Sequence, residues 1–155
     1  MTRLFLPLLV LLFLTACGSS EKKSTETTAT PPTQETPTAT AEDDRGISPI
    51  KEVKLSTPLD QTLAGEGNKL YDLKCSSCHR LTKEKLVGPG WAGVTTRRKP
   101  EWIMNFATNP DEMLNKDPKA IAMLEECLVR MPNQNVTEKE ARGLLEFMRK
   151  NDGEK

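Results

Sequence analysis

What the chain lacks already limits its fold and its chemistry. Its 155 residues include one histidine and four cysteines, which barely suffice for a structural zinc site with four Cys or His ligands. The 22 Lys and Arg balance the 22 Asp and Glu, so no strong long-range field steers a partner, and we expect no nucleic-acid partner. No segment shows a convincing period-2 strand pattern, so we expect helices and loops.

An apolar run from Leu4 to Leu14 follows Arg3 and is too short to cross a bilayer. It leads into Thr15-Ala16-Cys17, a small-residue cleavage site that ends in a cysteine. This pattern is similar to the lipobox of bacterial lipoproteins. The resemblance implies that residues 1–16 are a signal peptide and that Cys17 is acylated and anchors the protein to a membrane. An ordinary secretory signal with a stray cysteine is the alternative.

Residues 18–46 are rich in Ser, Thr, Pro and Glu and have almost no apolar side chains. Such a segment cannot bury enough surface to offset its ordering entropy, so we expect a disordered tether over residues 17–46, with a reach on the order of 30 Å. Gly18 stands where bacterial lipoproteins retained at the inner membrane carry Asp. The resemblance therefore implies a lipid-anchored, periplasm-facing protein of the cell envelope and favours the outer membrane.

Cys75-Ser76-Ser77-Cys78-His79 is a C-x-x-C-H motif, the spacing of covalent haem attachment. One turn separates the two cysteines and matches two vinyl groups on one porphyrin edge, and the next residue then points under the ring. We expect Cys75 and Cys78 to hold one haem c and His79 to ligate its iron. A redox dithiol, which needs a βαβ pattern, and a zinc site are weaker alternatives. Cys127 is left over and is expected to be a small core residue.

Residues 47–155 have the length of one small domain, and a covalent haem would enlarge its thin core. Apolar spacing predicts a helix over residues 61–74, directly before the motif, and another over 118–127. A short helix is expected over 101–107, with Pro100 at its first position. Thr137 and Glu140 form a capping box that opens a last amphipathic helix.

The sixth ligand of the iron must be a methionine, another group or nothing, because the chain has no second histidine. Met131 is the best candidate, since it lies in a loop ahead of the last helix and can reach the opposite haem face. Met113 is the second candidate. Three others fall at apolar helical positions and are expected in the core: Met104, Met123 and Met148.

Several stretches resemble the class I cytochromes c, over about residues 63–149: Gly67 to Tyr71, Cys75 to His79, Val87-Gly88-Pro89, Met131-Pro132 and a closing helix through Leu144 to Met148. The resemblance implies an all-α class I cytochrome c fold whose first and last helices cross near the haem. Gly67 and Tyr71 would then contact Leu144, Phe147 and Met148. It also makes the Pro89 carbonyl the acceptor for the ring N–H of His79.

One stretch departs from the usual pattern of that family. Where a leucine commonly follows the proline, this chain has Gly90-Trp91. Trp91 and Trp102 are therefore either haem-wall residues or plain core residues. Arg97 and Arg98 either pair with a haem propionate, given the affinity of arginine for carboxylates, or form a solvated basic turn.

A closer resemblance is to the small lipoprotein cytochromes c of the Bacteroidetes, some of which are encoded beside nitrous-oxide reductase. It is carried by three stretches: Ile47 to Ile50, Arg97 to Asn105 and Asn133 to Thr137. It implies an electron carrier, not an enzyme, that takes single electrons from a quinol-oxidising complex to a terminal reductase, such as nitrous-oxide reductase, or to an oxidase. Its partners would be redox proteins, with no small-molecule substrate. A five-coordinate haem sensor that binds NO, CO or peroxide is the alternative.

Overall fold

The computed structural model describes residues 44–47 and 49–155. The expected signal peptide, the acylated Cys17 and the tether up to residue 43 lie outside the described residues. Within the described part, no helix is long and apolar enough to span a membrane.

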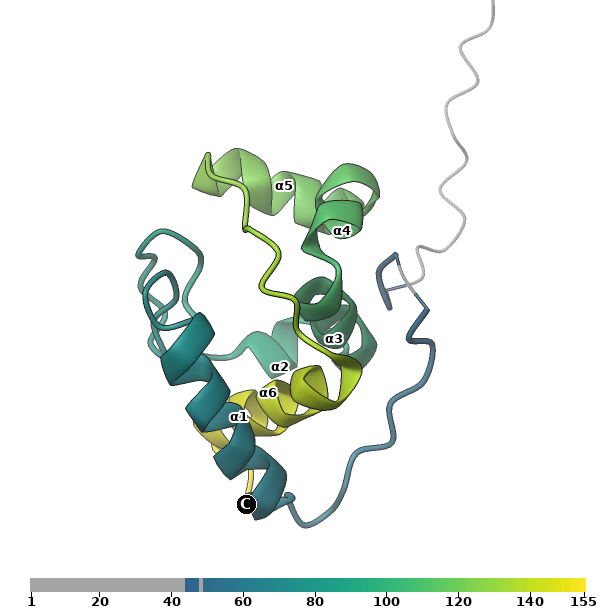
Figure 1. Cartoon of the computed structure of the whole chain (residues 1–155), viewed down its shortest axis with the longest axis vertical. Helices are drawn as coiled ribbons and strands as arrows, with labels where there is room; N and C mark the ends of the chain where they lie inside the picture. The colour runs from purple at the N-terminus through teal and green to yellow at the C-terminus, as the bar shows by residue number, and fades with distance from the viewer. Residues whose placement is uncertain (1–43, 48) are drawn as a thin grey trace, which may run out of the picture. The chain divides into compact units, whose positions relative to one another are not determined.

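The described residues form an all-α arrangement, as the sequence predicted (Figure 1). The only sheet-like pairing in this part of the chain is an isolated bridge between His79 and Lys85. The helices are α1 (Gln61–Lys74), α2 (Val94–Arg97), α3 (Pro100–Thr108), α4 (Pro110–Lys116), α5 (Pro118–Cys127) and α6 (Glu138–Asn151).

Side-chain caps explain where most of these helices begin. Asp60 accepts hydrogen bonds from the first turn of α1, and Thr137 and Glu140 form the predicted capping box of α6. Asn109 and Asp117 cap α4 and α5, and a proline at the first position of each of α3, α4 and α5 leaves no unpaired N–H there. The chain therefore turns sharply twice between residues 108 and 118.

α1 and α6 cross at two glycines. A Cβ atom on Gly67 would collide with the backbone of Gly143 and Leu144, so only glycine allows this close approach. One turn further along α1, the ring of Tyr71 packs on Phe147 with centroids 5.4 Å apart. The helix crossing expected from the resemblance is therefore present in the fold.

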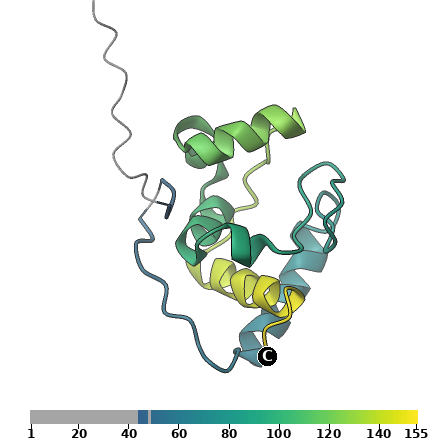
Figure 2. The same cartoon turned by 180° about the vertical axis from the view of Figure 1, so that it is seen from behind.

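The segment before α1, here called the strap (residues 44–47 and 49–59), runs around the domain from α3 to the start of α1 (Figures 1 and 2). Asn105 on α3 is fully buried; it accepts a hydrogen bond from the N–H of Ile50 and donates to the carbonyls of Ile50 and Arg45. Gly46 is buried against Met113. These contacts hold residues 44–46 on the domain, just ahead of the expected domain start at residue 47.

Candidate functional site

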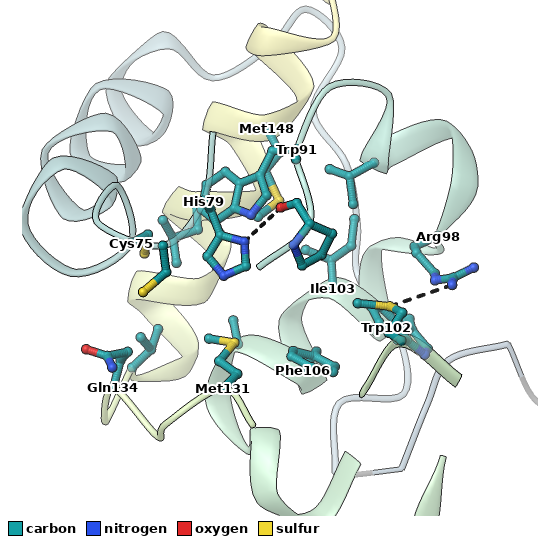
Figure 3. Close-up of a pocket in the computed structure, with 18 of the residues that line it drawn as sticks. Cys75, His79, Trp91, Arg98, Trp102, Ile103, Phe106, Met131, Gln134 and Met148 are labelled. Carbon is teal, nitrogen blue, oxygen red and sulfur yellow. Dashed lines mark hydrogen bonds between the residues drawn. The ribbon is translucent and has the colours of Figure 1, made fainter. Parts of the chain in front are cut away.

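A cavity of about 650 Å³ lies between the end of α1, α3, α5, α6 and the loops that contain residues 77–91 and 131–136. Its walls are mainly apolar and aromatic, and Figure 3 shows the side chains that border it. Pockets of this kind, with a few polar groups that converge on them, are the usual sites of cofactors.

The C-x-x-C-H motif forms one tight turn directly after α1. The N–H of Cys75 donates to the Tyr71 carbonyl, at 2.9 Å, and the N–H groups of Cys78 and His79 both donate to the Cys75 carbonyl. Both cysteines are free thiols that border the cavity. The turn therefore presents two thiols and an imidazole to the same space, as covalent haem attachment requires.

The two cysteine thiols differ in how deeply they are buried. Cys75 is buried, and desolvation raises the pKa of its thiol to about 11, against the opposing effect of neighbouring Lys74. Cys78 is only half-buried. Cys75 is therefore held as a neutral thiol at neutral pH.

The imidazole of His79 is fixed from several sides. Its Nδ1 lies 2.9 Å from the Pro89 carbonyl and donates to it, so Nε2 is left to bind a metal. A Cβ atom on Gly88 would collide with the ring, so the backbone of this loop packs directly against the imidazole. Burial lowers the pKa of His79, and the hydrogen bond to Pro89 only partly opposes this shift. The ring is therefore neutral, the form that ligates metals.

Three methionines border the cavity, and they lie in different places. Met131 is on the side opposite His79, whereas Met148 is on the same side as His79, near Trp91 (Figure 3). Met123 accepts a hydrogen bond from Arg98 at its sulfur, at 3.8 Å. It is half-buried and packs against the core, and it also borders the cavity.

The other two methionines of the described residues, Met104 and Met113, do not border the cavity. Met113, the second candidate for the axial position, is fully buried. Its sulfur accepts a hydrogen bond from the N–H of Ile47 in the strap, at 3.1 Å. Met104 is buried as expected. Neither sulfur is placed to reach a group bound between His79 and Met131.

The two tryptophans are both cavity wall and core. Trp91 is buried, with its ring centroid 5.0 Å from that of Tyr71 and 5.6 Å from that of His79. Trp102 stacks on Phe106 at 5.1 Å and donates from Nε1 to Asp117, at 3.1 Å. The two readings that the sequence left open therefore do not exclude one another.

A basic group closes the end of the cavity near α2 and α5. Arg97 and Arg98 both border the cavity, and so does Lys119, which the sequence did not single out. Arg97 is exposed and donates to the Ala92 carbonyl, at 2.6 Å. Arg98 is half-buried, with its guanidinium 4.9 Å from the centre of the Trp102 ring. Only the first of the two arginines fits a solvated turn.

Other site residues were also missed, and Cys127 was misplaced. Phe106, Gln134 and Val136 border the cavity, but they carry no motif that would have identified them. Cys127 is half-buried at the end of α5 and lies outside the core. Its expected place in the core is wrong because only Ala120 of α5 is buried.

The residues at this cavity fit a haem. Two thiols and a neutral imidazole converge on a large apolar space, a methionine stands opposite the imidazole, and cationic side chains at one end suit the two propionates. In residues 44–47 and 49–155, no group of three or more His, Cys, Asp or Glu side chains is placed to hold a metal ion. The zinc alternative therefore gains no support.

Comparisons with known proteins agree with this geometry. The family model for cytochrome c matches residues 64–152. A solved cytochrome c from Rhodothermus marinus is 35% identical with a TM-score of 0.65, and an engineered form, Rma TDE, is 34% identical with a TM-score of 0.65; each match covers 68% of this chain and 90% of the other.

A further engineered form from that organism, bound to a carbene intermediate, is 35% identical with a TM-score of 0.62 and the same coverage. No protein with a curated description matches the chain. The family match spans more than half of the sequence and includes the whole cavity-forming part from α1 to α6. The chain therefore belongs to the cytochrome c family, as a class I, monohaem member with covalently bound haem c.

Proposed function

We propose that this haem electron-transfer protein is a membrane-anchored carrier of single electrons in which His79 and Met131 are the two axial ligands. Cys75 and Cys78 would form the thioether bonds to the haem. The observation that carries the proposal is the placement of Met131 across the cavity from the imidazole of His79 (Figure 3). An iron with both axial positions filled by the protein suits electron transfer rather than ligand binding.

The surrounding residues would hold these ligands in place. The Pro89 carbonyl fixes the orientation of the His79 ring through the 2.9 Å hydrogen bond at Nδ1. Trp91 and Trp102 are buried walls that exclude water from the cavity. The bound haem supplies one-electron chemistry at its iron, and a methionine opposite a histidine raises the reduction potential.

Arg97, Arg98 and Lys119 are our candidates for the residues that pair with the propionates. All three border the cavity at one end, and Lys119 also pairs with Asp44 at the start of the strap. Arg98 is held over Trp102 and so has little conformational entropy left to lose when it binds a carboxylate.

The cellular role extends the same proposal. Acylation of Cys17 would tether the domain to a periplasm-facing membrane, with the outer membrane favoured. The carrier would accept electrons from a quinol-oxidising complex and pass them to a terminal reductase, such as nitrous-oxide reductase, or to an oxidase. A Cys17→Ser variant, expressed with its own signal, should appear in the soluble periplasmic fraction; continued membrane association would contradict the anchor.

Optical spectra and redox titrations of the haem-loaded protein test the ligand set. We expect Met131→Ala to lose the weak long-wavelength band of ferric His–Met haem and to lower the reduction potential, because the iron loses a soft ligand. Met123→Ala is the matched control, since Met123 borders the same cavity but its sulfur pairs with Arg98. It should keep both the band and the potential.

The opposite result would favour the competing function. If the native protein is already high-spin and Met131→Ala changes nothing, the iron has an open position. The protein would then be a sensor or binder of NO, CO or peroxide. One engineered relative is bound to a carbene intermediate, so binding of CO to the ferrous native protein is worth measuring in the same experiment.

A further inference from the structure

Most of the large hydrophobic side chains that the described part of the chain exposes belong to one group. We call this group the apolar rim: Leu73, Leu86, Val87, Leu128 and Val129. Leu73 is 78% exposed and Leu128 is 84% exposed, although burying such a side chain is worth roughly 1.5–3 kcal/mol. The remaining large exposed hydrophobic in these residues, Leu55, lies in the strap.

Hydrogen bonds between distant segments hold the apolar rim around one side of the haem cavity. Lys85, next to Leu86, donates to the Glu126 carbonyl near the end of α5, at 3.1 Å. Lys74, next to Leu73, donates to the Gln134 carbonyl, at 3.2 Å. Figures 1 and 2 agree in placing the loop after α1 beside the end of α5.

The cavity also opens on this side. On the side of the apolar rim, four side chains both border the cavity and are exposed to solvent: Leu73, Ser77, Glu126 and Pro132. Four members of the apolar rim, all except Leu73, do not border the cavity itself. A haem bound inside would therefore leave them exposed beside this opening of the cavity.

Leu128 has a backbone conformation and an exposure that do not stabilise the fold. It follows α5 with φ of +61°, in the left-handed region that glycine and asparagine adopt at lower cost. Its side chain is almost fully exposed, so packing offers no compensation. The fold itself therefore gives no reason for a leucine here, and this leucine belongs to an exposed apolar group of the kind that marks interaction sites.

Three cations beside the apolar rim are already used within the domain. The ammonium of Lys85 is held by the Glu126 carbonyl, and that of Lys74 lies between the Gln134 carbonyl and the Glu140 carboxylate. Arg130, directly after Val129, donates to the Asn115 side chain, at 3.0 Å. The rim thus offers apolar surface with its neighbouring cations in use, beside the exposed side chains of Glu125 and Glu126.

We propose that the apolar rim is the docking face for a redox protein whose own electron-transfer site is surrounded by uncharged, apolar residues. The inference rests on the electron-carrier function proposed above and names the chemistry of its partner. In the complex, one electron passes from the reduced protein to the oxidised partner, and no covalent bond forms or breaks. Because electron transfer slows steeply with distance, a partner docked at this opening would lie close enough to the haem for rapid transfer.

Electron self-exchange between reduced and oxidised copies of the haem-loaded protein provides a probe that needs no identified partner. Its rate follows from NMR line widths in mixtures of the two states. We expect Leu128→Asn/Val129→Ser to slow it about tenfold, since two apolar side chains leave the contact; asparagine suits the left-handed backbone at residue 128. Leu55→Ser is the matched control and should change nothing. Raising the salt concentration should barely affect the native rate.

Several outcomes would overturn the inference. Equal rates for the double variant and Leu55→Ser would remove the apolar rim from docking, and a steep fall of the native rate with salt would show a charged contact instead. If the native protein but not the double variant binds vesicles of phosphatidylglycerol and phosphatidylethanolamine, or forms a stable dimer, the rim serves that contact. A native protein that fails reversible one-electron titration would overturn the electron-carrier function itself, separately from its docking face.

Discussion

The two ends of the domain are packed in very different ways. In α6, eight of fourteen residues are buried, including Glu146 and Arg149, which are joined by a hydrogen bond of 2.7 Å. In α5, which has ten residues, only Ala120 is buried. α6 packs against α1 and α3, whereas α5 packs mainly against its neighbour α4.

The difference shows what completes the core at the α5 end. Ala122 and Met123 of α5 turn toward the haem cavity rather than toward another helix. The α1–α6 end thus has most of its core built from the chain, with only Leu144 and Met148 of α6 at the cavity, whereas the α5 end depends on the cofactor for apolar contacts. A covalently held haem is in this sense a structural element of the domain.

Loss of the haem should have the largest effect on the difference in packing between the α5 end and the α1–α6 end. In a Cys75→Ala/Cys78→Ala variant, which cannot form thioether bonds, we expect the amide protons of α5 to exchange freely with solvent. Those at the α1–α6 crossing should keep measurable protection, because their partners come from the chain itself. Hydrogen exchange followed by mass spectrometry measures both. Equal protection of α5 and α6 would contradict the comparison.

A smaller but still large effect is expected from the buried ion pair of α6. Glu146→Ala leaves the guanidinium of Arg149, itself 5% exposed, with only the partly exposed Glu154 as an ionic partner. Loss of one partner of a buried pair should lower the free energy of unfolding by about 3 kcal/mol. Denaturant unfolding of the haem-loaded protein measures this cost. Glu138→Ala, at the exposed start of the same helix, is the control and should change stability little.

The smallest of these effects belongs to the α5 end. Asp117 caps α5 and accepts a hydrogen bond from Trp102. Asp117→Ala should lower the free energy of unfolding by about 2 kcal/mol, because a cap and a buried acceptor are both lost. It should also disturb the haem spectrum, since Trp102 borders the cavity. Asp117→Asn keeps an acceptor oxygen and should behave almost like the native protein; an equal loss in both variants would contradict this role.

The helices that the sequence predicted well are those with local signals. The bounds of α1 and α5 match the prediction, and α6 begins at its capping box. α2 and α4 were missed because four and seven residues are too few to show a helical period. Asn109 both ends α3 and caps α4, so the two helices follow one another without a loop.

The residues of the site also differ in whether a local sequence signal identifies them. Cys75, Cys78 and His79 form one contiguous motif that can be recognised without a fold. Lys119 joins the cavity only because Asn109 and Asp117 turn the chain back toward α2. The strap could not have been foreseen, since Asn105 binds residues more than fifty positions away.

The strap also determines how mechanical load would reach the haem. A pull on the chain ahead of residue 44 first meets the ion pair of Asp44 with Lys119 and then the hydrogen bonds of Asn105 to Arg45 and Ile50. It then meets those of Arg142 and Arg149 to the carbonyls of Lys54 and Ser56. Only after these would force arrive at α1 and the attachment turn behind it. The strap thus isolates the haem-bearing turn mechanically from forces that arrive through the N-terminal side of the chain.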